Sequence, residues 1–153
     1  MGTELTALTQ TVTITEAVAD DHANGSTNDI DFAQTYTHTY GSIANVSKRI
    51  IKLANTNLTE VATFGTDTQN GAFVRADVRY IRVTNLDDTD ALQVGLDDED
   101  SDAAYTSVAA DSSIIFTGTT VEGGNGGSTL DNATALKVKG SANQQLEVMI
   151  ASV

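Results

Sequence analysis

Residues 49–65 read RIIKLANTNLTEVATFG, and residues 79–95 repeat the pattern as RYIRVTNLDDTDALQVG. The two copies lie thirty residues apart and align without a gap. In both copies an apolar strand with interspersed basic residues ends at Asn, a polar stretch follows, and a second apolar run ends at Gly. Strand patterns bounded by Asn, Asp and Gly are typical of β-hairpins. A looser third copy over residues 136–150 completes a set of three predicted hairpins.

Two further segments alternate between apolar and polar residues with a period of two. In residues 8–15 every second residue is a threonine, and the other face is Leu8, Gln10, Val12 and Ile14. Residues 30–40 alternate likewise, with Phe and Tyr on the more apolar face. This period is typical of half-buried strands. The threonines of the two segments would form a flat polar sheet face, which either faces solvent or serves as a contact surface. Residues 103–117 are expected to add one or two strands.

The strand pattern predicts an all-β fold, an antiparallel β-sandwich or jelly-roll-like domain built from hairpins. A chain of 153 residues fits one domain. We therefore expect an N-terminal arm over residues 1–7 and a single β-sandwich domain over residues 8–153. Aromatic residues make up only 5% of the chain and Trp is absent, so the core is expected to consist of Val, Ile, Leu and Ala.

The charge and the composition exclude several classes of partner. A net charge of −13 and a pI near 4.1 argue against nucleic acid and against an anionic membrane surface. No apolar run approaches the roughly 20 residues of a membrane span, and the residues after Met1 lack the features of a secretory signal. The absence of Cys excludes disulfides and thiolate metal sites.

No pattern of residues indicates catalysis. The two histidines, His22 and His38, are far apart in different contexts, and no Gly-x-Ser-x-Gly motif is present. The glycine-rich residues 122–128 lack the Lys-Ser/Thr ending of a phosphate-binding loop. We expect a protein that is not an enzyme and that carries no cofactor, with calcium as the one ion to consider.

A dense acidic stretch is the candidate metal site. Hard cations such as Ca²⁺ bind clustered oxygen ligands, and carboxylates this close repel one another unless they are neutralised. The stretch lacks the glycine and the spacing of the EF-hand loop, so a solvated acidic loop is the alternative. The candidate ligands are Asp97, Asp98, Glu99, Asp100 and Asp102.

The cations cluster on the outgoing strands of the three predicted hairpins. If those strands share a sheet, their side chains form a basic stripe that could dock onto an acidic partner surface. The alternative is that each cation balances nearby carboxylates. The eight residues are Lys48, Arg49, Lys52, Arg75, Arg79, Arg82, Lys137 and Lys139.

The second half of the chain resembles small virion proteins of tailed bacteriophages. The resemblance is carried by VRYIRVTNLDDTDALQVGL (78–96), SVAADSSIIFTG (107–118) and ATALKVKGSANQQLEVMIASV (133–153). It implies a capsid decoration (cement) protein or a head–tail component. Such a protein would be assembled into the virion in the host cytoplasm and would bind the major capsid protein or another virion protein. No site residue can be transferred from the family.

Two expectations about binding accompany this resemblance. The first is self-association, with a trimer expected, so that many weak contacts repeat over a lattice. The alternative function is a phage fibre, receptor-binding or other carbohydrate-binding β module. Such a module needs exposed aromatic residues, and the candidates are Tyr36, Tyr40 and Tyr105.

Overall fold

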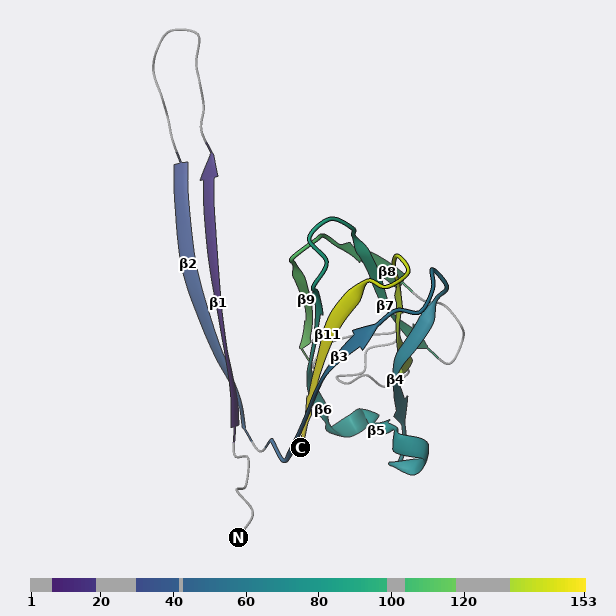
Figure 1. Ribbon diagram of the computed structural model, residues 1–153. Helices are drawn as coiled ribbons and strands as arrows, with labels where there is room; N and C mark the ends of the chain where they lie inside the picture. The colour runs from purple at the N-terminus through teal and green to yellow at the C-terminus, as the bar shows by residue number, and fades with distance from the viewer. Residues whose placement is uncertain (1–6, 19–29, 42, 99–103, 118–132) are drawn as a thin grey trace, which may run out of the picture. The chain divides into compact units, whose positions relative to one another are not determined.

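The computed structural model describes residues 7–18, 30–41, 43–98, 104–117 and 133–153 (Figure 1). The contacts within the chain divide it after residue 42 into two compact units. We call the first the ribbon, made of strands β1 (Ala7–Val18) and β2 (Ile30–Gly41), and the second the body, residues 43–153. The predicted single domain over residues 8–153 thus corresponds to two units, because β1 and β2 form a two-stranded sheet of their own.

The ribbon is a regular antiparallel pair. The register runs from Ala7 opposite Gly41 to Val18 opposite Ile30 without a bulge. The predicted strands are confirmed because β-branched residues alternate with period two along both segments. Threonines stand opposite threonines at three successive positions of one face, Thr9–Thr39, Thr11–Thr37 and Thr13–Thr35.

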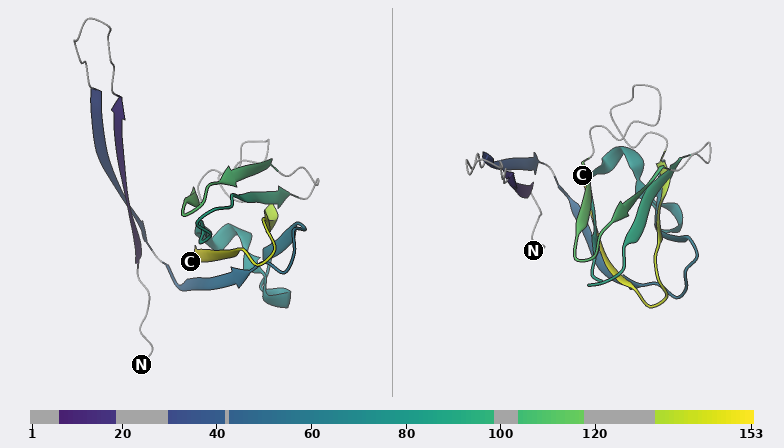
Figure 2. Two further views of the ribbon diagram at one scale, coloured as in Figure 1. Left: turned by 45° about the horizontal axis from the view of Figure 1, so that its top comes forward. Right: turned by 90° about the horizontal axis from the view of Figure 1, so that it is seen from above.

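The body consists of two sheets whose strand pairs are antiparallel except for the short β4–β5 pair. The five-stranded sheet has the order β5-β4-β10-β7-β8, and the four-stranded sheet has the order β3-β11-β6-β9. In Figure 1 the labelled strands of the four-stranded sheet form the left layer and β4, β7 and β8 the right layer; Figure 2 turns the same body. The strands are β3 (Asn45–Lys52), β4 (Thr59–Gly65), β5 (Phe73–Val74), β6 (Val78–Asn85), β7 (Leu92–Asp98), β8 (Ala104–Val108), β9 (Ser113–Thr117), β10 (Ala133–Lys139) and β11 (Gln145–Ser152).

The repeat copies form arches between the sheets. β3 and β6 begin the first and second copies and lie in the four-stranded sheet, whereas β4 and β7 end them and lie in the five-stranded sheet. The prediction that each copy is a hairpin is therefore wrong. Alternation shows which residues are buried but not which strand is the neighbour, and the connections 53–58 and 86–91 are long enough to cross the core. The hairpins of the described chain are β1–β2 and β7–β8.

The third copy lies between the other two. β11 pairs with β3 on one side and β6 on the other, and β10 pairs with β4 and β7, all antiparallel. Leu146 of β11 stands opposite both Ile51 and Asn85. The sequence repeat instead matches Ile51 with Ile81, which stands opposite Ile150. Relative to β11, the second copy is therefore displaced by four residues from its sequence alignment with the first.

The two sheets share one aliphatic core. Both contribute fully buried side chains, for example Leu136 and Val94 from one sheet and Val83 and Leu146 from the other. The predicted all-β, antiparallel fold is confirmed, and the shared core makes the body sandwich-like. The core members are Leu53, Val61, Ala62, Phe64, Val78, Ile81, Val83, Leu92, Val94, Val108, Ala133, Leu136, Val138, Leu146, Val148 and Ile150.

Helical structure in the described ranges is limited to two 3₁₀ turns, η1 (Gln69–Gly71) and η2 (Arg75–Asp77). They flank β5, whose short pairing with β4 is parallel. Asn70 and Gly71 both have positive φ, which explains the Asn-Gly pair at this turn. Neither turn has the length or the apolar character needed to cross a bilayer.

Candidate binding surfaces

The structure divides the predicted cations between two sheets. β3 and β6 carry Lys48 and Arg82 on the four-stranded sheet, whereas Lys137 and Lys139 lie on β10 of the five-stranded sheet. The alternation with buried neighbours directs these side chains outward, so the two groups are on opposite outer faces of the body. The condition for a single basic stripe, that the three strands share a sheet, is therefore not met, because the third copy begins in the five-stranded sheet whereas the other two begin in the four-stranded sheet.

On the four-stranded sheet, Glu147 of β11 joins the two flanking strands. Its carboxylate accepts hydrogen bonds from Lys48 Nζ of β3 at 3.0 Å and from Arg82 Nη2 of β6 at 2.5 Å. The Glu147 side chain is only 14% exposed. The hydrogen bond from Lys48, with a further contribution from Arg82, lowers the pKa of the Glu147 carboxyl despite its partial burial. We call these three residues the Glu147 cluster.

Two of the other predicted cations bond to backbone carbonyls. Arg49 donates through Nη2 to the carbonyl of Val61 in the opposite sheet, and Arg79 donates through Nη1 to the carbonyl of Ala76 at 2.5 Å. Both contacts tie neighbouring parts of the body together. Lys52 and Lys139 have exposed side chains. The structure thus uses several of the eight cations to hold strands in place.

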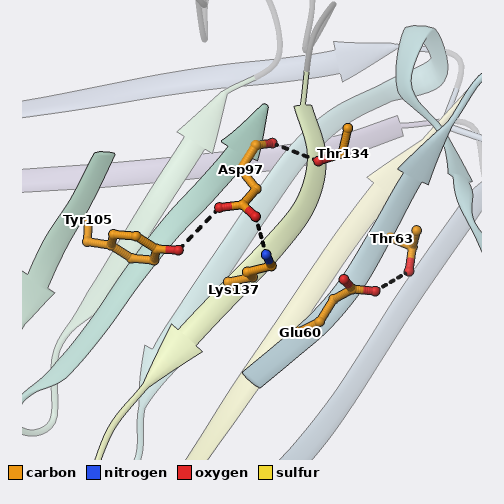
Figure 3. A network of polar contacts seen from close by, with 6 residues as sticks. All are labelled: Glu60, Thr63, Asp97, Tyr105, Thr134 and Lys137. Atoms are coloured by element: carbon orange, nitrogen blue, oxygen red, sulfur yellow. Dashed lines mark hydrogen bonds and ion pairs between the residues drawn. The ribbon is translucent and has the colours of Figure 1, made fainter. Parts of the chain in front are cut away.

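On the five-stranded sheet, Asp97 of β7 is the centre of a second network, shown in Figure 3. Its Oδ2 forms an ion pair with Lys137 of β10, its Oδ1 accepts a 3.2 Å hydrogen bond from the Tyr105 hydroxyl of β8, and its carbonyl accepts one from Thr134. Beside it on β4, Thr63 donates to Glu60 at 2.8 Å. The network joins three adjacent strands by charge and hydrogen bonds.

The charges of this network shift two pKa values. The hydrogen bond to Asp97 raises the pKa of the Lys137 ammonium. Partial burial, followed by the negative charge of Asp97, raises the pKa of the Tyr105 hydroxyl. Both groups therefore stay protonated at neutral pH, when Lys137 is positive and Tyr105 is a donor. This favours a structural arrangement over acid–base chemistry by Tyr105.

The calcium prediction is only partly covered by the structure. The Asp97 carboxylate is engaged by Lys137 and Tyr105, and Asp98 ends β7. Glu99, Asp100 and Asp102 lie outside the described residues. Within the described ranges no group of three or more His, Asp or Glu side chains is arranged to hold a metal ion. Calcium binding by this stretch stays a prediction.

Next to the Asp97 network lies a surface groove of roughly 370 Å³. Tyr105 and Leu58 are 39% and 45% exposed, so the groove offers an aromatic ring and an aliphatic side chain beside amide and ammonium groups. The sequence indicated Tyr105 as an exposed aromatic residue and Lys139 as one of the clustered cations, but it gave no sign that the β3–β4 connection meets them. The lining residues are Thr56, Asn57, Leu58, Gln93, Tyr105 and Lys139.

A buried polar pair closes one end of the body. Asn85 is fully buried and donates through Nδ2 to the carbonyls of Asp90 at 2.7 Å and Ala109 at 3.1 Å. Gln144 donates through Nε2 to Asn85 Oδ1 at 3.0 Å and, at the same distance, to the Asp90 carbonyl. These bonds join the β6–β7, β8–β9 and β10–β11 connections. The role of Gln144 had no signal in the sequence.

One histidine and two of the four tyrosines lie in the ribbon. His22 lies outside the described residues, and His38 and Tyr36 are in β2 opposite Gln10 and Val12. Tyr40, also in β2, donates through its hydroxyl to Gln10 Oε1 at 3.1 Å. The three tyrosines proposed for glycan binding thus belong to different units, because Tyr105 is in the body.

Comparison with protein-family models, with curated proteins and with solved structures finds no match to this chain.

Proposed function

We propose that this chain is a non-enzymatic structural protein that binds to a larger protein assembly, specifically a decoration protein that stabilises a virus capsid shell. One observation carries the proposal: the ribbon is a sheet of only two strands, twelve residues each. An isolated two-stranded sheet is at best marginally stable in water. A ribbon of this length therefore needs a protein surface to support it, which suits a protein that functions within an assembly.

The edges of the ribbon support the same proposal. Free sheet edges are usually blocked by Lys, Pro or a bulge, which prevent pairing with other chains. β1 and β2 contain neither Lys nor Pro, and their register is regular throughout. Apart from Glu16 and Asp31, the ribbon thus lacks the residues that usually protect a sheet edge against contact with another protein.

The threonine face is the surface that we assign to the shell. Thr9, Thr11 and Thr13 of β1 and their partners on β2 are exposed. The hydroxyls of Thr13 and Thr35 lie 3.3 Å apart, so the face is a flat ladder of hydrogen-bonding groups. A face of this kind can pair with backbone and polar groups of a shell without introducing charge.

The test is cosedimentation of the purified protein with expanded capsid shells that lack decoration. We expect saturable binding and a higher temperature of shell disruption. Thr11→Asp should abolish binding, because it places a charge on the threonine face, whereas Ser107→Asp, at an exposed strand position of the body opposite the exposed Gln93, should bind normally. Equal shell stability with and without the protein would reject the proposal.

A second candidate function, carbohydrate binding, is favoured by the groove at Tyr105. A flat aromatic ring beside the amides of Asn57 and Gln93 has the chemistry that a sugar needs, an apolar stacking surface with hydrogen-bonding groups at its rim. A glycan array with the wild-type protein and Tyr105→Ala would test it. Selective glycan binding that the substitution removes would favour this function over capsid decoration.

A further inference from the structure

The two open sides of the body differ in their protection against contact with other chains. On one side, the edge strand β3 carries three cations, and one of them, Arg49, donates to the carbonyl of Val61 in β4. On the other side, the edge strands β8 and β9 contain no charged residue and no Pro, and their pairing has no bulge. Lys, Pro and bulges are the usual protection of a sheet edge. The β8–β9 side lacks all three.

The backbone of β9 has unpaired groups along its free edge. The amide of Asn85 in β6 donates to the carbonyl of Ser112 at 2.9 Å, and the β6–β9 register continues from there without a shift. Because successive strand residues direct their backbone groups to alternate sides, every second residue of β9 faces away from β6. Among the residues that the structure describes, none forms a backbone hydrogen bond to these groups. The residues that face away are Ser113, Ile115 and Thr117.

The core is also open beside β9. Ile114 and Phe116 pack against the core but remain partly exposed. A further strand beside β9 would cover them with its own inward-facing side chains, since side chains alternate between the two faces of a sheet. In strand addition of this kind, backbone hydrogen bonds supply affinity and alternate side chains supply specificity. The edge therefore fits an extended segment in which every second residue is apolar.

The charge at the start of β9 indicates the chemistry of that segment. Residues 83–136 contain no Lys or Arg. The amide of Asp111, shortly before β9, donates to the carbonyl of Asp87 at 2.9 Å, which brings two acidic connections together. Hydrogen bonds from the backbone amides of Asp90 and Thr89 lower the pKa of the Asp87 carboxyl, so it is ionised at neutral pH. This end of β9 complements a basic partner.

We propose that the free edge of β9 binds an extended segment of another protein, which adds an antiparallel strand to the four-stranded sheet and carries basic residues at its C-terminal end. In an antiparallel pair that end lies beside the start of β9, where Asp87 and Asp111 are. A second copy of this chain fits the edge less well, because each copy has a net charge of −13 and like charges repel. The inference goes beyond the proposed function, since this edge belongs to the body and the threonine face to the ribbon.

The experiment measures binding of a fluorescent synthetic peptide to the full chain by anisotropy. The lysine peptide alternates valine and threonine and ends in two lysines, and the glutamate peptide ends in two glutamates instead. We expect saturable binding of the lysine peptide and at least roughly tenfold weaker binding of the glutamate peptide. Asp111→Asn keeps the shape of a side chain at a position with a φ of 53°, which Asn tolerates. It should weaken binding of the lysine peptide about threefold.

Proline substitutions test the assignment to β9. Ile115→Pro removes an N–H that points to the free edge and breaks no bond to β6, so the sheet tolerates it but cannot add a strand there. We expect at least roughly tenfold weaker binding of the lysine peptide. The matched control is Ile50→Pro on the edge strand β3. The N–H of Ile50 also faces its free edge, because Leu53, three residues later, donates to Gln144. This variant should bind normally.

A further variant leaves the backbone of β9 unchanged. Ser113 is exposed, and Ser113→Lys places a cation beside the lysine end of the peptide, so it should also weaken binding. Thermal unfolding of each variant shows whether the body is folded. If Ile115→Pro does not fold, Ser113→Lys tests the assignment to the edge.

Four results would overturn the inference. Absence of binding by the lysine peptide would reject it, while cosedimentation with shells would still test the proposed function. Equal binding of the two peptides would remove the assignment of charge. Equal weakening by Ile115→Pro and Ile50→Pro would remove the assignment to β9. A wild-type dimer in light scattering that Ile115→Pro dissociates would mean that a second copy occupies the edge.

Discussion

Asn85 is the residue on which three connections of the body depend. Its amide group donates hydrogen bonds to backbone carbonyls of the β6–β7 and β8–β9 connections. Its Oδ1 accepts a hydrogen bond from Gln144 of the β10–β11 connection. Asn85→Ala leaves these buried groups without their partner, so we predict a loss of about 2–3 kcal/mol in the free energy of unfolding. Urea denaturation measures this loss.

The repeat supplies the matched control. Asn55 occupies the same place in the first copy and its Oδ1 accepts the amide of Asn57, as Asn85 Oδ1 accepts that of Asp87. Asn55 is exposed, so Asn55→Ala removes the turn bond without burying an unsatisfied group. We expect a loss below about 1 kcal/mol. Equal losses in the two variants would contradict the role given to burial.

Glu147 should make stability depend on pH. Its pKa is lower in the folded protein than in the unfolded chain, where it is about 4.3. Its contribution is therefore fully present above that value and is lost as the pH falls through the lower folded pKa. We predict that Glu147→Gln costs about 1 kcal/mol near pH 7, and that the difference from wild type shrinks below about pH 4.

The control for this prediction is Glu60→Gln, because Glu60 is an exposed carboxylate that accepts only a threonine hydroxyl in the described structure. We expect that Glu60→Gln changes the free energy of unfolding of the protein very little, both at neutral and at acidic pH. A Glu147→Gln effect of constant size from neutral to acidic pH would show that charge is not its cause.

At the scale of residues, the sequence predicted which positions are buried better than it predicted polar partners. The alternation around Ile81 and Val83 indicated their burial correctly. It gave no sign that Lys48, rather than the repeat-matched Lys52, would share Glu147 with Arg82. That pairing depends on the register of β11 between two strands far apart in the chain.

At the scale of elements, the ribbon and the body should be separable. Every member of the body's core comes from residues after 42. We predict that deleting residues 1–42 changes the thermal midpoint of the body by less than about 3 °C in scanning calorimetry. A fall of more than about 10 °C would mean that the ribbon contributes to the stability of the body.

The arches explain why element pairing was predicted less well than the elements themselves. An apolar strand, a polar connection and a second apolar strand fit a hairpin and an arch equally. In a hairpin the two apolar faces lie on one side of a sheet, whereas in an arch they face each other across the core. The choice was made by β10 and β11, which are distant in sequence and lie between the first two copies.

At the scale of the whole molecule, the net charge of −13 should make stability depend on ionic strength. Self-repulsion opposes the compact state, and salt shortens its range from about 30 Å at 0.01 M to about 10 Å at 0.1 M. We predict that the melting temperature rises with sodium chloride, as measured by calorimetry. The partly buried Glu147 cluster is screened less, so it should not reverse the trend.

Calcium chloride at the same ionic strength as the sodium chloride distinguishes screening of the net charge from specific calcium binding. A melting temperature that is higher in calcium chloride than in sodium chloride, and that EDTA returns to the sodium chloride value, would support a calcium site at the acidic stretch from Asp97 to Asp102. Identical melting temperatures in the two salts would leave the stretch as a solvated loop. A melting temperature that falls with sodium chloride would contradict the repulsion argument.

The sequence by itself determined the strands, their buried faces, the aliphatic core and the threonine ladder, because period-two alternation and side-chain branching act between neighbours along the chain. Only the tertiary structure decided that the repeats are arches, that the cations divide between two faces, and that Asn85 meets Gln144. Those outcomes depend on which strands become neighbours. That choice follows from burying two apolar sheets against each other, and no local pattern encodes it.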